Sequence, residues 1–250
     1  MGGGFPLYRS KDGTMELVIS GPGKVSSAAA AGYLAGRNCD NGKLSGWINF
    51  GIAGSGSEDY GKVFLGNCIS SVSGVENWYP PAVWPKKVDL ERRRIITVEE
   101  PTKDYPNDGA LVEMEAAGFY PTVLRMGTTE LCQVMKVVSD DPGHAMEAVD
   151  KATVIGLCHD ALDQANDWLA AFRGLVEEEA IKYTEPDAFQ ELLSELRFSV
   201  TQQHQLRRLL QQLVALGFEG KIVASSWKDG KSCLSELRKE LENLRASVDG

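Results

Sequence analysis

The chain has 250 residues, 43% of them hydrophobic and 24% charged, which is enough for one large domain or for one domain with a smaller unit attached. Its formal net charge of −9 argues against nucleic-acid binding, because a surface that binds phosphates needs clustered lysine and arginine. The five cysteines lack C-x-x-C spacing and no apolar run is long enough to span a membrane, so we expect a cytoplasmic protein with no metal site, no cofactor and no membrane partner.

From residue 15 to about 140, short apolar runs alternate with glycine-rich breaks. Each run is rich in the β-branched and aromatic residues that strands favour, and several are apolar at consecutive positions, as in strands covered on both faces. The sequence therefore predicts an α/β fold. The expected strands are MELVIS (15–20), GWINFGIAG (46–54), FLGNCISSV (64–72), RIITVE (94–99) and CQVMKVVS (132–139).

A helix is expected between the first two of these strands. Ser26 or Ser27 can cap the segment AAAAGYLAG, and Gly36 can end it.

After residue 143 apolar residues recur at intervals of three and four, which predicts helices over 144–183 and 187–216. A last helix, over 232–248, carries a leucine stripe that either packs on the domain's own helices or contacts another chain. The stripe consists of Leu234, Leu237, Leu241 and Leu244. We expect an α/β domain over 1–180 and a helical C-terminal extension over 181–250, packed on that domain or used for association.

Three glycine-rich or acidic segments each follow an expected strand, at 20–28, 51–57 and 139–144. Ligands of open α/β sheets bind beyond the carboxyl ends of strands, so these three loops are candidates for one shared cleft. The first loop holds Gly21-x-Gly23 without the third glycine of a dinucleotide fingerprint, and a tight turn alone would also need these glycines.

The pair Asp140-Asp141 stands where an apolar strand ends. One interpretation is a helix cap before HAMEAV, because aspartate is a preferred N-cap residue. The other is a general acid that points into the cleft. One aspartate can cap while the other lines the cleft.

The segment LVEMEAAGFY, residues 111–120, places Glu113 and Glu115 just before a small-residue segment. If a helix begins near Met114, Glu115 falls in its first turn, where the helix dipole favours a carboxylate. The following AAG implies a backbone packed closely against another element, so the carboxylate is expected to be less solvated than a surface one and to need a polar partner.

Together and in this order, ISGPGKVSSAAAAGYL, INFGIAGSG, ALVEMEAAGFY and VMKVVSDD resemble the nucleoside phosphorylase and nucleosidase superfamily, above all its methylthioadenosine/S-adenosylhomocysteine nucleosidase branch. The resemblance spans residues 15 to 141. It implies a three-layer α/β sandwich around a mixed, distorted sheet, and an enzyme that cleaves the N-glycosidic bond of a purine nucleoside.

The resemblance also implies roles for the residues of LVEMEAAGFY and its neighbours. Met114 packs on the ribose and Glu115 accepts its hydroxyl groups, with Glu113 as the adjacent acid near the sugar. An oxocarbenium-like sugar is positively charged, so nearby carboxylates stabilise it.

At the base, the resemblance assigns Asp140 to protonating or hydrogen-bonding purine N7 and Ser139 to orienting the base. Ala53 and Gly54 match the backbone strip beside the ligand, and Lys136 stands where the family has an arginine. Four aromatic residues are available to stack on a base, although beside prolines they are equally compatible with a structural role: Trp78, Tyr79, Trp84 and Tyr105.

The chain also departs from the family pattern. Relatives begin with a further strand whose loop supplies a water-activating glutamate, and no residue here matches it. No arginine stands in CISSVSGVEN, where phosphorolytic relatives hold phosphate. We therefore expect hydrolysis rather than phosphorolysis. The alternative is a catalytically degenerate protein that binds a nucleoside or acts as a scaffold. The expected partners are a small-molecule nucleoside and a second copy of the chain in a homodimer.

Overall fold

The computed structural model describes most of the chain, namely residues 4–38, 44–57, 59–83, 87–88, 90–183, 186–218 and 222–248. These residues fall into two compact units, and the division between them lies within one long helix, between Val176 and Glu177. The first unit is α/β and the second is helical.

The first unit contains a mixed sheet whose main strands pair in a closed ring. β3 (Trp47–Ser55) is parallel to β8 (Cys132–Asp140), and β8 is antiparallel to β4 (Val63–Ser71). β4 continues in parallel with β6 (Arg92–Thr97), β6 with β7 (Leu111–Glu113), and β7 returns antiparallel to β3. The short β5 (Asn77–Trp78) is added to β4, and β1 (Leu7–Arg9) with β2 (Glu16–Val18) forms a separate hairpin sheet.

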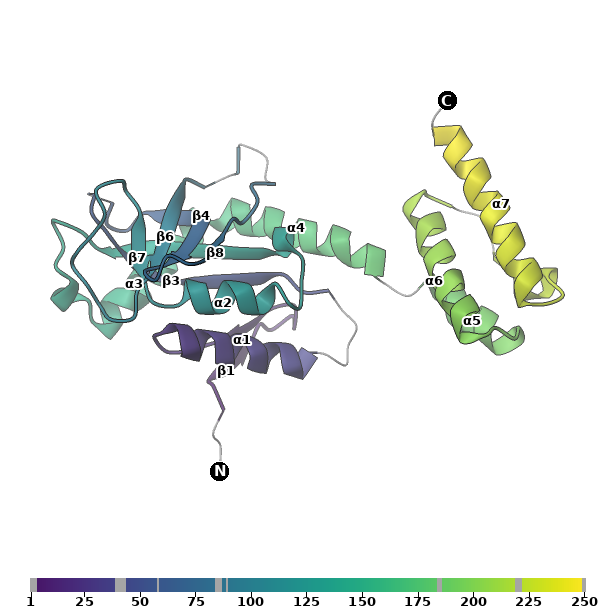
Figure 1. Cartoon of the computed structure of the whole chain (residues 1–250), viewed down its shortest axis with the longest axis horizontal. Coiled ribbons are helices and arrows are strands. Elements are labelled where there is room, and N and C mark those ends of the chain that lie inside the picture. Colours follow the sequence, from purple (N-terminus) through teal and green to yellow (C-terminus); the bar gives the residue numbers. More distant parts are fainter. Residues whose placement is uncertain are drawn as a thin grey trace. The chain divides into compact units, whose positions relative to one another are not determined.

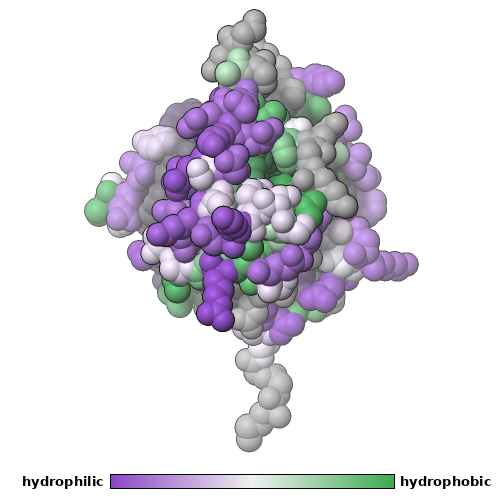
Figure 2. Space-filling model, turned by 90° about the vertical axis from the view of Figure 1, so that its right-hand side faces the viewer, coloured by the Kyte–Doolittle hydropathy of each residue, from purple (hydrophilic) through white to green (hydrophobic). Residues whose placement is uncertain are grey.

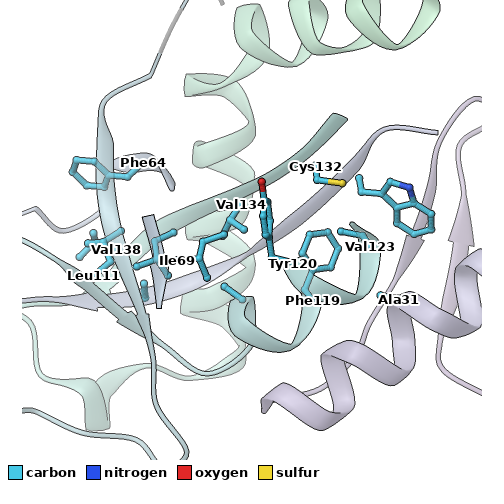
Figure 3. Close-up of a cluster of buried hydrophobic side chains, with 14 of the residues drawn as sticks. Ala31, Phe64, Ile69, Leu111, Phe119, Tyr120, Val123, Cys132, Val134 and Val138 are labelled. Carbon is cyan, nitrogen blue, oxygen red and sulfur yellow. The ribbon is translucent and has the colours of Figure 1, made fainter. Parts of the chain in front are cut away.

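Helices cover both faces of this sheet (Figure 1). On one face, α1 (Lys24–Asn38) and α2 (Ala116–Val123) pack on the side chains of alternate strand residues such as Trp47 and Val134. Figure 3 shows this cluster, with Phe119, Tyr120 and Val123 of α2 directed at the strands. On the other face, α3 (Lys151–Gln164) and α4 (Asn166–Tyr183) cover the intervening strand residues. The predicted α/β sandwich around a mixed, distorted sheet is confirmed.

The first helix differs from its predicted bounds. α1 begins at Lys24, so Ser26 and Ser27 lie inside it, and it continues past Gly36. The early start depends on Gly21 and Gly23, which have φ of 72° and 99° and so allow the chain to turn sharply out of β2. Gly36 lacks this left-handed conformation and therefore does not end the helix.

The close approach that AAG implies is confirmed at Gly118. A Cβ atom on this residue would collide with the carbonyl oxygen of Lys24, so the first turn of α1 lies directly against α2. α2 itself begins at Ala116, with Glu115 as its N-cap residue, two positions later than expected. The cause is β7, whose pairing with β6 extends through Glu113.

The interpretation of Asp140 or Asp141 as a helix cap is wrong. Asp140 is the last residue of β8, and Asp141 forms a turn with Gly143 and His144. The single turns η2 (Thr129–Leu131) and η3 (Met146–Ala148) flank this region, and α3 is capped by Asp150, whose carboxylate accepts the Thr153 N–H at 2.8 Å.

The second unit packs α5 (Asp187–Glu195), α6 (Val200–Ala215), the turn η4 (Ala224–Ser226) and α7 (Gly230–Val248) around its own core. The single helix predicted over 187–216 is two, because Ser199 and Gln202 form a capping box that starts α6. The leucine stripe of α7 faces this core, so its packing on the chain's own helices is confirmed. Figure 2 shows one surface of the molecule, on which hydrophilic residues predominate and hydrophobic ones form small areas.

Among the helices that the structure describes, none has both the length and the apolar character needed to cross a membrane.

Candidate active site

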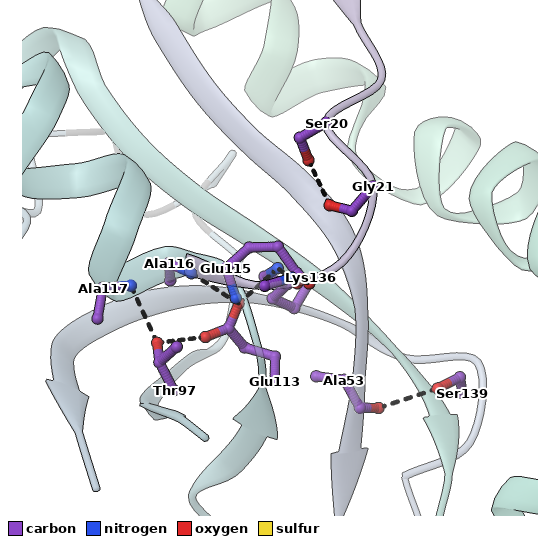
Figure 4. A network of polar contacts seen from close by, with 11 residues as sticks. Ser20, Gly21, Ala53, Thr97, Glu113, Glu115, Ala116, Ala117, Lys136 and Ser139 are labelled. Atoms are coloured by element: carbon purple, nitrogen blue, oxygen red, sulfur yellow. Dashed lines mark hydrogen bonds and ion pairs between the residues drawn. The ribbon is translucent and has the colours of Figure 1, made fainter. Parts of the chain in front are cut away.

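A buried lysine of β8 lies at the centre of the polar network in Figure 4. Lys136 pairs with Gly51 of β3 in the sheet, and a Cβ atom at Gly51 would lie 3.3 Å from the lysine Nζ. Nζ lies 2.8 Å from Glu113 Oε2 and 3.3 Å from Glu115 Oε2, and the lysine side chain is 1% exposed. The two acids of LVEMEAAGFY therefore share one cation from β8, which is separated from β7 in the sheet by β3.

These contacts set the charge of Lys136. Burial acts to lower the pKa of its ammonium group, but the charges of Glu113 and Glu115 outweigh burial and hold the pKa above its ordinary value. Lys136 is therefore a cation at neutral pH.

The carboxylate of Glu113 is buried and bonds to groups of the protein itself. Its side chain is fully buried, and Oε2 also accepts the backbone N–H groups of Glu115 and Ala116, each at 2.9 Å. Its Oε1 accepts the hydroxyl of Thr97, which in turn accepts the N–H of Ala117 at 2.9 Å. Glu113 thus binds the orphan N–H groups at the start of α2 and neutralises Lys136.

Glu115 is the member of this network that reaches solvent, with 19% of its side chain exposed. Oε1 accepts the N–H of Gly23 at 3.0 Å, while Oε2 faces Lys136. The carboxylate is thereby fixed between the β2–α1 turn and β8. Met114, the residue between the two acids, is partly buried.

A second acidic group stands at the end of β8. The register of β3 and β8 shifts here, so that Ala53 pairs with Val138 and Gly54 with Asp140. The extra residue, Ser139, donates its hydroxyl to Asp140 Oδ1 at 2.6 Å and to the Ala53 carbonyl at 3.4 Å. Asp140 is 6% exposed.

Lys136 and Asp140 are four residues apart on one strand, which corresponds to about 13 Å along β8. The residues Gly51 to Gly54 of β3 run beside this stretch. The structure therefore places one oriented carboxylate, Glu115, near one end of a glycine-containing strip and another, Asp140, at the other end.

Two of the three loops expected to share a cleft contact each other, and the third contacts Glu115 instead. The loop at 20–28 contacts Glu115 through Gly23, and the loops at 51–57 and 139–144 meet through Ala53 and Ser139. Of the aromatic candidates, Trp78 packs against the sheet core, Tyr79 is 67% exposed and Trp84 lies outside the described residues.

Tyr105 is the aromatic candidate that reaches the site. Its hydroxyl donates to Asp140 Oδ2. Neither this contact nor the role of Thr97 was predicted from the sequence. Tyr105 lies in an irregular segment between β6 and β7, where no periodicity indicates the direction of a side chain. Thr97 did give a signal, because it is a polar residue within the apolar run RIITVE.

Comparisons with known proteins gave matches among solved structures only. No protein-family model matches the chain, and no curated protein does. One similar structure is a methylthioadenosine/S-adenosylhomocysteine nucleosidase from Colwellia psychrerythraea in complex with adenine, with 16% identity, a TM-score of 0.48, and coverage of 70% of this chain and 85% of that chain.

Two further structures are similar to a comparable degree. The nucleosidase MTAN from Chlamydia trachomatis has 16% identity and a TM-score of 0.47, covering 68% of this chain and 84% of its own. A futalosine hydrolase mutant from Helicobacter pylori has 14% identity and a TM-score of 0.48, covering 67% and 85%. Because these identities are low, the functional argument rests on the contacts of this chain.

Proposed function

We propose that this chain hydrolyses the N-glycosidic bond of a purine-type nucleoside. The observation that carries the proposal is the pair of oriented carboxylates, Glu115 and Asp140, at the two ends of the strip from Gly51 to Gly54. A nucleoside offers a hydroxyl-bearing sugar at one end and a flat base at the other, and this matches a partly exposed carboxylate and a glycine-containing strip that ends in an acid.

Glu115 serves the sugar. Its carboxylate is held by Gly23 and Lys136, so it needs no reorganisation to accept ribose hydroxyls with its remaining lone pairs. When the bond to the base breaks, the sugar becomes oxocarbenium-like, and a fixed negative charge stabilises it. Met114, which immediately precedes Glu115, supplies an apolar contact to the ribose.

Asp140 serves the base. The departing base must gain a proton, and a carboxyl group at the end of β8 is in position to deliver one or to bind the protonated ring nitrogen. Ser139 orients that carboxyl group through its 2.6 Å hydrogen bond. Water attacks the anomeric carbon, forming the new carbon–oxygen bond as the carbon–nitrogen bond breaks, and the proton that the water releases balances the one that the base gains.

Glu113 and Lys136 act through Glu115. Both side chains are buried, so we assign them to positioning Glu115 rather than to direct contact with the ligand. Ala53 and Gly54 provide backbone beside the base.

The function is tested by incubating the protein with a panel of nucleosides, with and without phosphate, and measuring the free base by chromatography. We expect release that does not depend on phosphate. Dependence on phosphate would instead identify a phosphorylase.

A second candidate function is nucleoside binding without turnover. The observation that favours it is the contact of Tyr105 with Asp140, which occupies an oxygen of the acid. Thermal shift separates the two: nucleosides that stabilise the protein, combined with no release of base, identify a binding protein.

The chain is further expected to act in the cytoplasm as a homodimer. Sedimentation velocity over a range of protein concentrations tests the dimer.

A further inference from the structure

Tyr105 occupies the base end of the candidate site. Its hydroxyl donates to Asp140 Oδ2 while Ser139 donates to Oδ1, so each oxygen of this buried carboxylate has a donor from the protein. Burial and then the hydrogen bond to Asp140 raise the pKa of the Tyr105 hydroxyl well above its ordinary value. The phenol therefore stays protonated and remains a donor over the working range of the protein.

The ring of Tyr105 also covers the strip beside Asp140. A Cβ atom on Gly54 would lie 2.5 Å from Tyr105 Cε1 and 2.6 Å from Asp140 Oδ2. Just beyond the end of β3, a Cβ atom on Gly56 would lie 3.0 Å from the Pro106 carbonyl oxygen. The ring thus rests on the backbone where the proposed function places the base.

The part of the chain around Tyr105, residues 102–108, makes ion pairs near the surface. Lys103 pairs with Glu147 across the end of β8, and both side chains are more than half exposed. Arg94 of β6 pairs with Asp108 at 2.6 Å, again near the surface. Exposed ion pairs contribute little to stability, so these contacts allow the segment to be displaced by a ligand.

We propose that Tyr105 is a binding determinant of this site that competes with the ligand: a base must displace its hydroxyl from Asp140 and its ring from Gly54. This inference rests on the proposed function, because it takes the base to bind at Asp140. Leaving a buried carboxylate oxygen without a hydrogen-bond donor costs free energy. A base that replaces Tyr105 must therefore offer Asp140 an N–H donor of its own.

Isothermal titration with adenine, a purine base that carries N–H donors, tests the competition in the parent protein and in Tyr105→Phe. This substitution keeps the ring and removes the competing hydroxyl, so the Kd for adenine is expected to fall about tenfold, as a hydrogen bond to a charged group no longer has to be broken. Tyr8→Phe is the matched control, because Tyr8 is 57% exposed on β1, and it is expected to leave the Kd unchanged.

The outcomes separate this inference from the proposed function. Equal Kd values for the parent and Tyr105→Phe would overturn the competition and leave nucleoside hydrolysis standing. Tighter binding by Tyr105→Phe without release of base from any nucleoside would support the competition and overturn hydrolysis. Failure of adenine to bind any of the three proteins, with folding checked by circular dichroism, would overturn the competition, while hydrolysis is judged by the release of base.

Discussion

Lys136 Nζ lies 2.8 Å from Glu113 Oε2, and neither side chain is more than 1% exposed. This buried ion pair joins the middle of β8 to the end of β7. Lys136 also contacts a second carboxylate, that of Glu115, which reaches solvent. The lysine therefore both stabilises the fold and fixes an acid of the candidate site.

Removing the lysine charge should destabilise the α/β unit strongly. Lys136→Met leaves Glu113 buried without a counter-ion, which is expected to lower the free energy of unfolding by about 3–5 kcal/mol in urea denaturation. Lys103→Met, which removes an exposed ion pair, is the control and should change it by less than about 1 kcal/mol.

The double variant Lys136→Met with Glu113→Gln should be more stable than Lys136→Met alone, because the carboxylate that remains, Glu115, is partly exposed to solvent and not fully buried. A loss below about 1 kcal/mol in Lys136→Met would contradict the buried ion pair.

Lys136 also shows how much of this site the sequence could predict. A lysine in the middle of an apolar strand covered on both faces needs a buried counter-ion, and that signal is readable in CQVMKVVS. The identity of the counter-ion is not readable, because it depends on the pairing of β7 between β6 and β3. With three residues, β7 is too short for any periodicity.

The longer strands were predictable for the opposite reason. β3, β4 and β8 each run for nine residues rich in apolar side chains, and their observed ends lie within one residue of the predicted ones. Closure of the ring through β4 and β8 was not predictable, because it is a long-range pairing that no local pattern encodes.

Gly118 is expected to be intolerant of substitution. Gly118→Ala places a methyl group against the Lys24 carbonyl and should cost about 1–3 kcal/mol of unfolding free energy through overpacking, measured by urea denaturation. Gly36→Ala is the matched control in a helix with open space around it, and should instead stabilise by about 0.5–1 kcal/mol. Equal effects of the two substitutions would exclude close packing of α1 on α2.

The turn after β8 should give the protein an acid-sensitive contact. Burial alone would raise the pKa of Asp141, but hydrogen bonds from His144 and from the backbone N–H groups of Tyr60 and Gly143 outweigh it and lower the pKa. A lowered pKa contributes stability that is complete above the ordinary value of 3.8 and is lost as the pH falls through the folded-state value.

Asp141→Asn is therefore expected to lower the unfolding free energy by about 1–3 kcal/mol at pH 7, with the difference from the parent narrowing below about pH 4. Denaturation midpoints between pH 7 and pH 3 measure this, with the exposed Asp104→Asn as control. A difference that stays constant over this range would show that the Asp141 charge is not responsible.

The leucine stripe of α7 should contribute to folding rather than to association. Leu237 is 3% exposed in the core of the helical unit, so Leu237→Ala should cost about 2–5 kcal/mol in unfolding free energy and leave the sedimentation coefficient unchanged. Val214→Ala, at a position 52% exposed on α6, is the control and should have little effect. A change in association with unaltered stability would favour an interface between chains.

Release of free base from a purine nucleoside, measured by chromatography for the parent, Asp140→Asn, Glu115→Gln and the exposed control Glu76→Gln, tests hydrolysis most directly. We expect the parent and Glu76→Gln to release base at equal rates without phosphate, and the two site variants to be slower by about 10²-fold or more. No release by the parent from any purine nucleoside, or equal rates in all four proteins, would contradict the assignment of Glu115 and Asp140 to this chemistry.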